Sequence, residues 1–277
     1  MTPKIKTAVI PVAGRGTRIM PLTLHQPKGM VNIVDRPLVH YVIDEVIAAG
    51  ITRIIMVTSP EQTEFQLYVE YLLKKDPEWQ KKHLTFEFAV QEKPLGDGDA
   101  LWSARRLIKD EPFLVCFSDD LLIDKRPPLK TLTDFYEKTG APIVVLEPVP
   151  KTKVSSYGVV KAKTDKNYKP LYKIEDVVEK PTIEDAPSNL TVIGRYVVTP
   201  KLYSLLEKQY PYQGKEIKLA GALKLYAQSG QPLYGWEFPG LRFDAGSKIG
   251  ILKAQAYFGT YHQELGPEFK KFLKKLQ

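Results

Sequence analysis

The sequence has almost no cysteine and no long apolar run. Its 277 residues include a single cysteine, Cys116, so the chain cannot form an internal disulfide. The apolar runs are well short of the roughly twenty residues that a helix needs to cross a bilayer. No charged and then apolar leader opens the sequence, and its 18 glycines and 22 prolines are scattered without a period. We therefore expect a soluble globular protein of the cytoplasm, with Cys116 in its core.

Positive charge exceeds negative charge, but it is spread along the chain. Forty Lys and Arg residues against 32 Asp and Glu residues give a formal net charge of +8. Such an excess can indicate nucleic acid, an anionic lipid surface or a small anionic substrate. The densest cluster of lysines, within residues 270–275, lies on an amphipathic segment and is typical of a solvated helix face. Because no nucleic-acid-binding motif accompanies it, we expect neither nucleic acid nor a membrane as a partner.

Strand-like runs alternate with helix-like runs in the first 150 residues. Ser59 and Gln62, for example, have the spacing of a capping box at a helix start. The alternation predicts an α/β fold with a mainly parallel, Rossmann-like sheet flanked by helices. The predicted strands are residues 6–12, 53–58, 85–90, 113–117 and 142–147, and the predicted helices are residues 37–49, 59–75, 99–108 and 129–138.

The β-character is stronger from about residue 151 to residue 198. Runs at 158–161, 171–178 and 190–198 predict an additional, smaller antiparallel sheet folded over the first half. Further helices are predicted at 200–208, 216–229 and 247–257, before the amphipathic tail. Because the chain has no internal repeat and no Gly/Ser linker, we expect one catalytic domain over residues 1–277.

A glycine-rich turn, residues 13–18, follows the first predicted strand. Glycines let the backbone pass close to a ligand and offer N–H groups to phosphate oxygens. The dinucleotide fingerprint would need Gly in place of Ile19, and a Walker A loop would need an ending that is absent here. Arg18 and Lys28 supply two cations that suit a triphosphate. Taken alone, a tight turn with surface cations explains the pattern equally well.

Acidic residues follow two of the predicted strands. Asp119 and Asp120 come directly after the strand at 113–117, at the edge of the sheet where ligands of open α/β sheets bind. Paired carboxylates suit a hard cation such as Mg²⁺, although an Asx turn or a helix cap is an equal alternative. Asp244 also lies between a strand and a helix, and alone it would be interpreted as a helix cap.

In this order, the motifs resemble those of the sugar-1-phosphate nucleotidylyltransferases, and most of all the bacterial-type UTP–glucose-1-phosphate uridylyltransferases. The resemblance covers about residues 6–269. It rests on the segments 14–23, 27–28, 35–37, 118–120, 157–159, 179–181, 187–190, 194–196, 216–217 and 244–248, with Gln91 and Gly96. It implies a GT-A-like fold and transfer of a uridylyl group from UTP to a sugar 1-phosphate, expected to be glucose 1-phosphate, with Mg²⁺ as cofactor.

The resemblance also implies roles for individual residues. Arg18 and Lys28 would hold the triphosphate and stabilise the transition state, while Asp119 and Asp244 would share the Mg²⁺ ion. The implied nucleotide-binding residues are Ala13, Gly14, Gly16, Thr17, Gln91 and Gly96, and the implied residues for the sugar and its phosphate are Gly158, Glu179, Lys180 and Glu216. Residues 1–150 would bind the nucleotide, 151–246 the sugar, and 247–277 would form C-terminal helices. A homo-oligomer, a dimer or a tetramer, is also implied.

Several positions depart from the pattern of that family. Gly29 stands where Glu is usual, Asp99 replaces a usual His, and Lys218, Ala220 and Gly221 replace a usual Gln, Thr and Asp. These departures leave two alternatives open. One is a thymidylyltransferase that acts on glucose 1-phosphate, and the other is a non-catalytic regulator that binds a nucleotide sugar.

Overall fold

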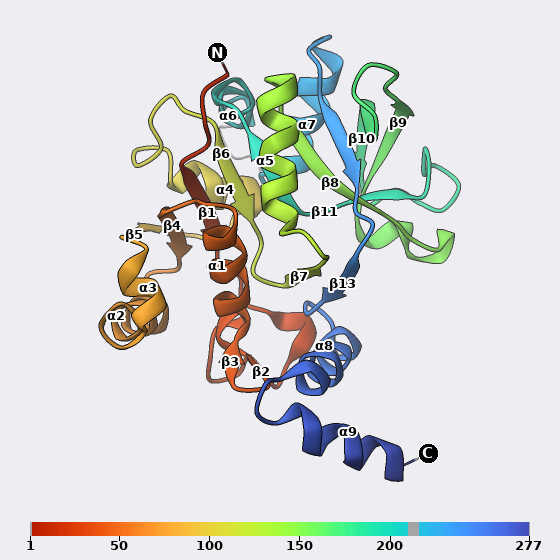
Figure 1. Ribbon diagram of the computed structural model, residues 1–277. Helices are drawn as coiled ribbons and strands as arrows, with labels where there is room; N and C mark the ends of the chain where they lie inside the picture. The colour runs from red at the N-terminus through yellow and green to blue at the C-terminus, as the bar shows by residue number, and fades with distance from the viewer. Residues whose placement is uncertain (1, 210–215, 277) are drawn as a thin grey trace.

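A computed structural model describes residues 2–209 and 216–276. Within these residues, nine strands form one sheet in the order β5-β4-β1-β6-β11-β8-β12-β10-β9 (Figure 1). The first four strands in this order pair in parallel, as the sequence predicts. They are β5 (Thr85–Val90), β4 (Arg53–Thr58), β1 (Thr7–Pro11) and β6 (Phe113–Cys116).

The rest of the sheet is mixed, which corrects the expectation of a mainly parallel sheet. β11 (Leu190–Val198) runs antiparallel to both β6 and β8 (Ile143–Pro148), and β12 (Tyr234–Glu237) runs parallel to β8. β10 (Leu171–Glu179) is antiparallel to β12 and to β9 (Gly158–Thr164), and β9 pairs again with β11. The predicted separate antiparallel sheet is therefore a continuation of the main sheet, closed on itself through β11 and β9.

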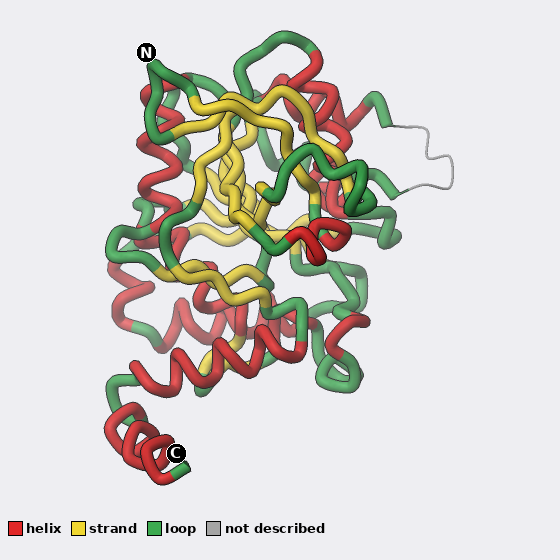
Figure 2. Tube along the Cα trace, turned by 90° about the vertical axis from the view of Figure 1, so that its right-hand side faces the viewer, coloured by secondary structure: helices red, strands yellow, loops and turns green. Residues whose placement is uncertain are grey.

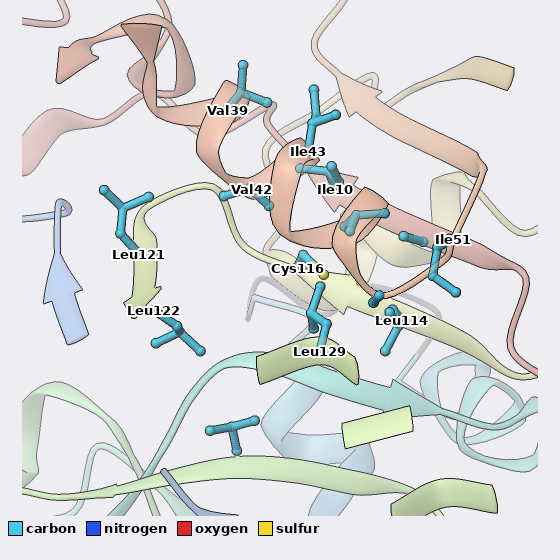
Figure 3. Packing of buried hydrophobic residues seen from close by; sticks show 14 of the residues in the cluster. Ile10, Val39, Val42, Ile43, Ile51, Leu114, Cys116, Leu121, Leu122 and Leu129 are labelled. Carbon is cyan, nitrogen blue, oxygen red and sulfur yellow. The ribbon is translucent and has the colours of Figure 1, made fainter. Parts of the chain in front are cut away.

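Alternate residues of the central strands pack into two apolar clusters on opposite faces of the sheet. Ala8 and Ile10 of β1 belong to one cluster and Val9 to the other, as the two-residue period of a strand requires. The first face is covered by α1 (Leu38–Ala48) and α5 (Pro128–Thr139), and Figure 3 shows Cys116 buried there, as predicted. The second face is covered by α4 (Asp97–Ser103), α6 (Pro200–Glu207) and α7 (Leu219–Gln228).

The first two helices show how local signals set element boundaries. α1 follows Pro37 and ends before Gly50, whose φ of +83° suits glycine. The second helix was predicted from residue 59, but α2 begins later and spans Glu64–Lys75. The Gln62 side chain accepts a hydrogen bond from the Ser59 N–H at 2.9 Å, so this half of the capping box stabilises a turn before the helix.

The sequence analysis expected a strand before Asp244, but it missed a second strand, β7, and the ribbon that the two strands form. β7 (Asp120–Ile123) follows Asp119 directly and pairs antiparallel with β13 (Leu241–Asp244). Asp120 lies opposite Asp244 in this ribbon, which brings two distant acidic segments together (Figure 1). The remaining short elements are β2 (Asn32–Ile33), β3 (Arg36–Pro37), α3 (Pro77–Lys81), and the 3-10 helices at Thr17–Ile19, Lys28–Met30 and Lys151–Ser156.

Two helices end the chain. α8 (Lys248–Tyr261) packs beside β13, and α9 (Gly266–Lys275) extends beyond it from the body of the molecule (Figures 1 and 2). The amphipathic tail is thus a helix, as predicted, and its Phe272 side chain is exposed. Among the helices in residues 2–209 and 216–276, none is both long and apolar enough to span a bilayer.

Candidate active site

Two adjoining cavities lie over the carboxyl ends of β1 and β6, the edge where α/β sheets bind ligands. Their volumes are about 500 Å³ and about 200 Å³. Arg18, Phe117 and Asp119 line both cavities, so the two spaces meet beside the glycine-rich turn. The larger cavity contains the predicted residues Ala13, Gly14, Arg18, Lys28, Gln91, Gly96, Asp119, Glu179, Lys180 and Glu216, and the smaller adds Gly158 and Asp244.

The glycine-rich turn is shaped by Gly16. Its φ is +64°, and a Cβ there would lie 2.8 Å from Thr23 Cγ2 and 2.9 Å from Lys28 Cβ. The Gly16 carbonyl accepts a hydrogen bond from the Thr23 hydroxyl at 2.9 Å. Gly16 therefore holds the turn against the Lys28 segment, whereas Thr17 lines a neighbouring cavity of about 580 Å³. These two predicted nucleotide-binding residues are not brought into the lining of the other cavities.

Two cations stand next to Asp119. The Lys28 ammonium donates to Asp119 Oδ2 at 2.6 Å, and Arg18 Nη2 lies 3.8 Å from the same oxygen. Burial raises the pKa of the Asp119 carboxyl, but Lys28, a backbone hydrogen bond and Arg18 together outweigh this effect, and the pKa lies below its usual value. Because the Arg18 side chain is 65% exposed and that of Lys28 only 19%, Arg18 is the more available to a ligand.

Asp119 and Asp244 face one small space, although they are far apart in sequence. A Cβ on Gly246 would lie 2.9 Å from Asp119 Oδ2, 2.8 Å from Asp244 Oδ1 and 2.7 Å from Arg18 Nη2. The Tyr157 hydroxyl donates to Asp244 Oδ2 at 3.1 Å. The described residues contain no group of three or more His, Cys, Asp or Glu side chains arranged to hold a metal. Two carboxylates still fit Mg²⁺, which completes its shell with water and phosphate oxygens.

Asp120 points away from this space and holds the ribbon together. Its Oδ1 accepts from Arg242 Nε at 2.6 Å, and its Oδ2 accepts from the Gly194 N–H at 2.7 Å. Arg242 also donates to Glu147 Oε2 at 2.7 Å. Since the side chains of both Asp120 and Arg242 are less than a tenth exposed, this ion pair is a structural link between β7, β13 and β8.

A buried arginine braces the turn that carries Asp119. Arg195 on β11 donates to the backbone oxygens of Phe117 and Asp120 at 2.8 and 2.7 Å, and it pairs with Glu45 at 2.7 Å. Sequence reasoning assigned no role to Arg195. The available signal is a lone charged residue in an otherwise apolar strand, which predicts a buried ion pair.

The Gly96 segment is joined to the segment before α7. Gly96 has φ of +119°, and a Cβ there would lie 2.3 Å from the Ile217 carbonyl oxygen, so only glycine fits. The Ile217 N–H donates to the Leu95 carbonyl at 2.7 Å, and the Gly98 N–H donates to the Ile217 carbonyl at 2.9 Å. Gln91 lies beside this segment and donates to the Gly96 carbonyl at 2.9 Å. These hydrogen bonds join the Gly96 segment to the segment before α7, and both segments line the larger cavity.

A cavity-lining carboxylate that sequence reasoning missed strengthens this joint. Asp97 lines both cavities and accepts a hydrogen bond from the Leu219 N–H at 2.9 Å, at the first turn of α7. Burial raises the pKa of the Asp97 carboxyl. Because Lys218 makes no side-chain cap at this helix end, Asp97 supplies the acceptor and negative charge that a helix N-terminus favours.

Lys218 bridges two of the predicted sugar-binding carboxylates. Its ammonium lies 3.0 Å from Glu179 Oε1 and 3.3 Å from Glu216 Oε2. Gly158 lies close by, since a Cβ there would be 3.2 Å from Glu179 Oε2. The Lys180 N–H donates to the Tyr157 carbonyl at 3.0 Å, and Lys180 has a left-handed φ of +48°. This end of the site therefore carries both signs of charge.

The departure at Gly29 has a packing explanation. A Cβ on Gly29 would lie 3.0 Å from Cε1 of Phe65, a fully buried ring on α2. A glutamate side chain has no room there unless Phe65 moves.

The backbone of Lys218, another departure, is held by Gln209. The Gln209 side chain accepts from the Lys218 N–H at 3.2 Å and donates to the Lys218 carbonyl at 3.1 Å.

The fold and this site together define an α/β protein with a charged site at the carboxyl ends of its parallel strands. The glycine-rich turn, the two cations and the paired carboxylates meet there. Residues 7–259 match the nucleotidyl transferase family, and the chain belongs to that family. The resemblance inferred from the motifs is thereby confirmed.

Named relatives cover nearly the whole chain. The UTP–glucose-1-phosphate uridylyltransferase of Streptococcus pneumoniae serotype 4 is 37% identical over 293 residues, covering 100% of this chain and 97% of the relative. The enzyme of that name from Bacillus subtilis is 34% identical, covering 99% and 97%.

Solved structures of similar proteins agree in fold. A UDP-glucose pyrophosphorylase complexed with UDP-glucose has a TM-score of 0.85 at 36% identity, covering 93% of this chain and 100% of that chain. A UTP-bound UGPase from Acinetobacter baumannii has a TM-score of 0.84 at 33% identity, covering 99% and 100%.

Proposed function

We propose that this chain transfers the uridylyl group of UTP to glucose 1-phosphate, giving UDP-glucose and pyrophosphate. Full-length relatives carry the name of this activity, and similar structures hold UTP or UDP-glucose. The observation in this chain that best supports the proposal is the meeting of Arg18, Asp119 and Asp244 where the two cavities join. The larger cavity would then hold the nucleotide and, at its side lined by Lys180 and Glu216, part of the sugar phosphate, and the smaller cavity would extend from there past Gly158.

The reaction needs positioning and charge neutralisation more than it needs a nucleophile from the protein. An oxygen of the sugar phosphate attacks the α-phosphorus of UTP, while the bond from that phosphorus to the bridging oxygen of the β-phosphate breaks. Pyrophosphate leaves with that oxygen, and no covalent enzyme intermediate is required. Arg18 and Lys28 would hold the triphosphate and stabilise the charge that develops on the departing pyrophosphate.

The other predicted residues complete this assignment. Asp119 and Asp244 would hold Mg²⁺, which when bound would screen the phosphate oxygens of the two anionic substrates. Ala13, Gly14, Gln91 and Gly96 would contact the base, and Gly158, Glu179, Lys180 and Glu216 would contact the sugar and its phosphate.

The remaining expectations stay predictions. They are a nucleotide-binding part over about residues 1–150, a sugar-binding part over 151–246, C-terminal helices over 247–277, a cytoplasmic location and a homo-oligomer.

A pyrophosphate-release assay over a matrix of nucleoside triphosphates and sugar 1-phosphates tests the function. We expect UTP with glucose 1-phosphate to give the highest or second-highest turnover. Among the other nucleoside triphosphates, we expect TTP to be the best alternative substrate. Higher turnover with ATP or GTP than with both UTP and TTP would overturn the assigned base site. Tight binding without turnover of any pair would favour the non-catalytic regulator instead.

A further inference from the structure

The side-chain amide of Gln91 is held by two oxygens. Gln91 follows the end of β5 and is 6% exposed. Its Nε2 lies 2.9 Å from the Gly96 carbonyl oxygen and 2.8 Å from Asp99 Oδ2. Asp99 is itself 8% exposed and lies in the first turn of α4. Both contacts are therefore made in a part of the site that is largely closed to water.

The chemistry of these two oxygens decides which end of the amide faces them. A backbone carbonyl has no hydrogen to donate, and an ionised carboxylate also only accepts. Turning the Gln91 amide over would set its Oε1 against both oxygens with no hydrogen between them. Although the two ends of an amide look alike, the hydrogen-bond network fixes this orientation. Both N–H bonds of Gln91 are used inside the protein, and Oε1, an acceptor, is left to meet a ligand.

Uracil offers one matching group on its pairing edge. Its N3–H is a donor, flanked by the acceptors O2 and O4, whereas N3 of cytosine is an acceptor. Gln91 lines the larger cavity, together with Ala13 and Gly14. We propose that Asp99 is a positioning residue that locks the Gln91 amide, so that Gln91 Oε1 accepts the N3–H of uracil and disfavours cytosine. The inference rests on the proposed uridylyl transfer.

The two oxygens differ in what a substitution can test. The Gly96 carbonyl belongs to the backbone and is fixed by the close approach of Ile217. The Asp99 carboxylate can be removed. Losing one of two acceptors should leave the Gln91 amide free to rotate, because a single remaining hydrogen bond constrains it less. Base discrimination should then weaken, and a role of Asp99 in folding alone would not produce this change.

Base preference in matched variants tests the proposal. The ratio of kcat/KM for UTP to that for CTP is measured with glucose 1-phosphate in the wild type, in Asp99→Ala and in Asp99→Asn. We expect the ratio to fall about tenfold in Asp99→Ala, the equivalent of one ordinary hydrogen bond, mostly through a loss with UTP. Asp99→Asn keeps an oxygen that accepts from Gln91 Nε2, so its ratio should stay within about threefold of the wild type.

Two further variants separate local damage from base reading. Leucine has the same branching as asparagine but no hydrogen-bond acceptor, so Asp99→Leu replaces Asp99→Ala in the test if Asp99→Ala does not fold. Ser103→Ala removes a hydrogen bond to the Asp99 backbone without touching Gln91, so it should affect UTP and CTP equally. An unchanged ratio in folded Asp99→Ala or Asp99→Leu, with normal wild-type use of UTP, would overturn this inference alone. A wild type that does not use UTP would overturn the proposed function first.

Discussion

The two ends of the proposed site are built differently. Asp119 and Asp244, at the end proposed to bind phosphate (the phosphate end), lie at the ends of paired strands. Glu216 and Lys218, at the end proposed to bind the sugar (the sugar end), lie on a segment that leads into α7. The register of β7 with β13 fixes the first pair, Arg195 donates to the backbone oxygen of Asp120, and Arg242 pairs with the Asp120 side chain. The second pair is held by a few hydrogen bonds from side chains of neighbouring loops and helices.

This difference fits one group of the departures from related enzymes, Lys218, Ala220 and Gly221, but it does not account for Gly29 or Asp99. A substitution at the phosphate end would disturb strand register or a buried ion pair. At the other end, Lys218, Ala220 and Gly221 can change while the backbone stays attached through Ile217 to Leu95 and Gly98. We therefore expect substitutions at Lys218, Ala220 and Gly221 to disturb the backbone less than substitutions at the ends of β7 and β13.

The largest expected effect comes from the two carboxylates that share the small space. Asp119→Asn or Asp244→Asn should lower kcat by at least about a hundredfold, a barrier increase near 2.7 kcal/mol, because each disables the same metal site. The double variant should lose much less than the product of the single effects. Asp124→Asn, an exposed residue after β7, is the matched control and should keep its activity.

Metal removal completes this test. Activity should disappear in EDTA and return with added Mg²⁺, while the circular dichroism spectrum of each variant stays that of the wild type. Full activity in EDTA, or strictly additive losses in the double variant, would contradict a shared magnesium site.

The second effect concerns the exposed guanidinium of Arg18. Arg18→Ala should lower turnover by about a hundredfold, in line with the loss of one oriented donor to a developing charge. Arg18→Lys should restore little, because a compact ammonium does not reproduce a planar two-pronged donor. Steady-state kinetics measure both, with the exposed Arg106→Ala as a control outside the two cavities. Near-normal turnover in folded Arg18→Ala would reduce the glycine-rich turn to a structural element.

Asp120 should affect stability more than chemistry, although it adjoins Asp119. Asp120→Asn removes the charge that Arg242 meets at 2.6 Å in a buried position. We expect the free energy of unfolding in urea to fall by about 2 kcal/mol, with Glu147 still pairing Arg242. The kcat of the folded protein should fall less than about tenfold. A kcat loss as large as that of Asp119→Asn, with unchanged stability, would place Asp120 in the catalytic machinery.

The sequence predicts the bounds of several strands of the sheet well. β4, β5 and β11 begin and end at the predicted residues. β11 was predicted as a strand of a separate antiparallel sheet, but it lies antiparallel between β6 and β8 of the main sheet, and a local pattern does not show which strands will be its neighbours. β7 was missed because its four residues follow Asp119 without a turn signal. Strand direction and short ribbons depend on distant segments, which a local pattern does not contain.

For the candidate site, the motifs indicate which residues are present but not which side chains they contact. Arg18, Lys28 and the two acids could be selected from their places after strands, and the structure brings them together. The contact of Lys218 with Glu179 spans 39 positions and depends on the path of β10 relative to α7, so no sequence spacing indicates it. The glycine at position 29 is likewise explained only by the structure, because Phe65, which is 36 positions away, packs against it.

The smallest expected effect concerns Lys218, the residue that most distinguishes the sugar end. Lys218→Gln restores the residue usual in related enzymes but leaves Glu179 and Glu216 without their bridging cation. Two uncompensated carboxylates should repel a dianionic sugar phosphate, so its KM should rise about threefold to tenfold, while the KM for UTP stays nearly unchanged. The rise should shrink at high salt, because partly exposed charges are screened. Lys224→Gln, an exposed lysine on α7, is the control. An equal rise for both substrates, or a rise that salt does not reduce, would show that Lys218 acts through the fold and not through charge at the sugar end.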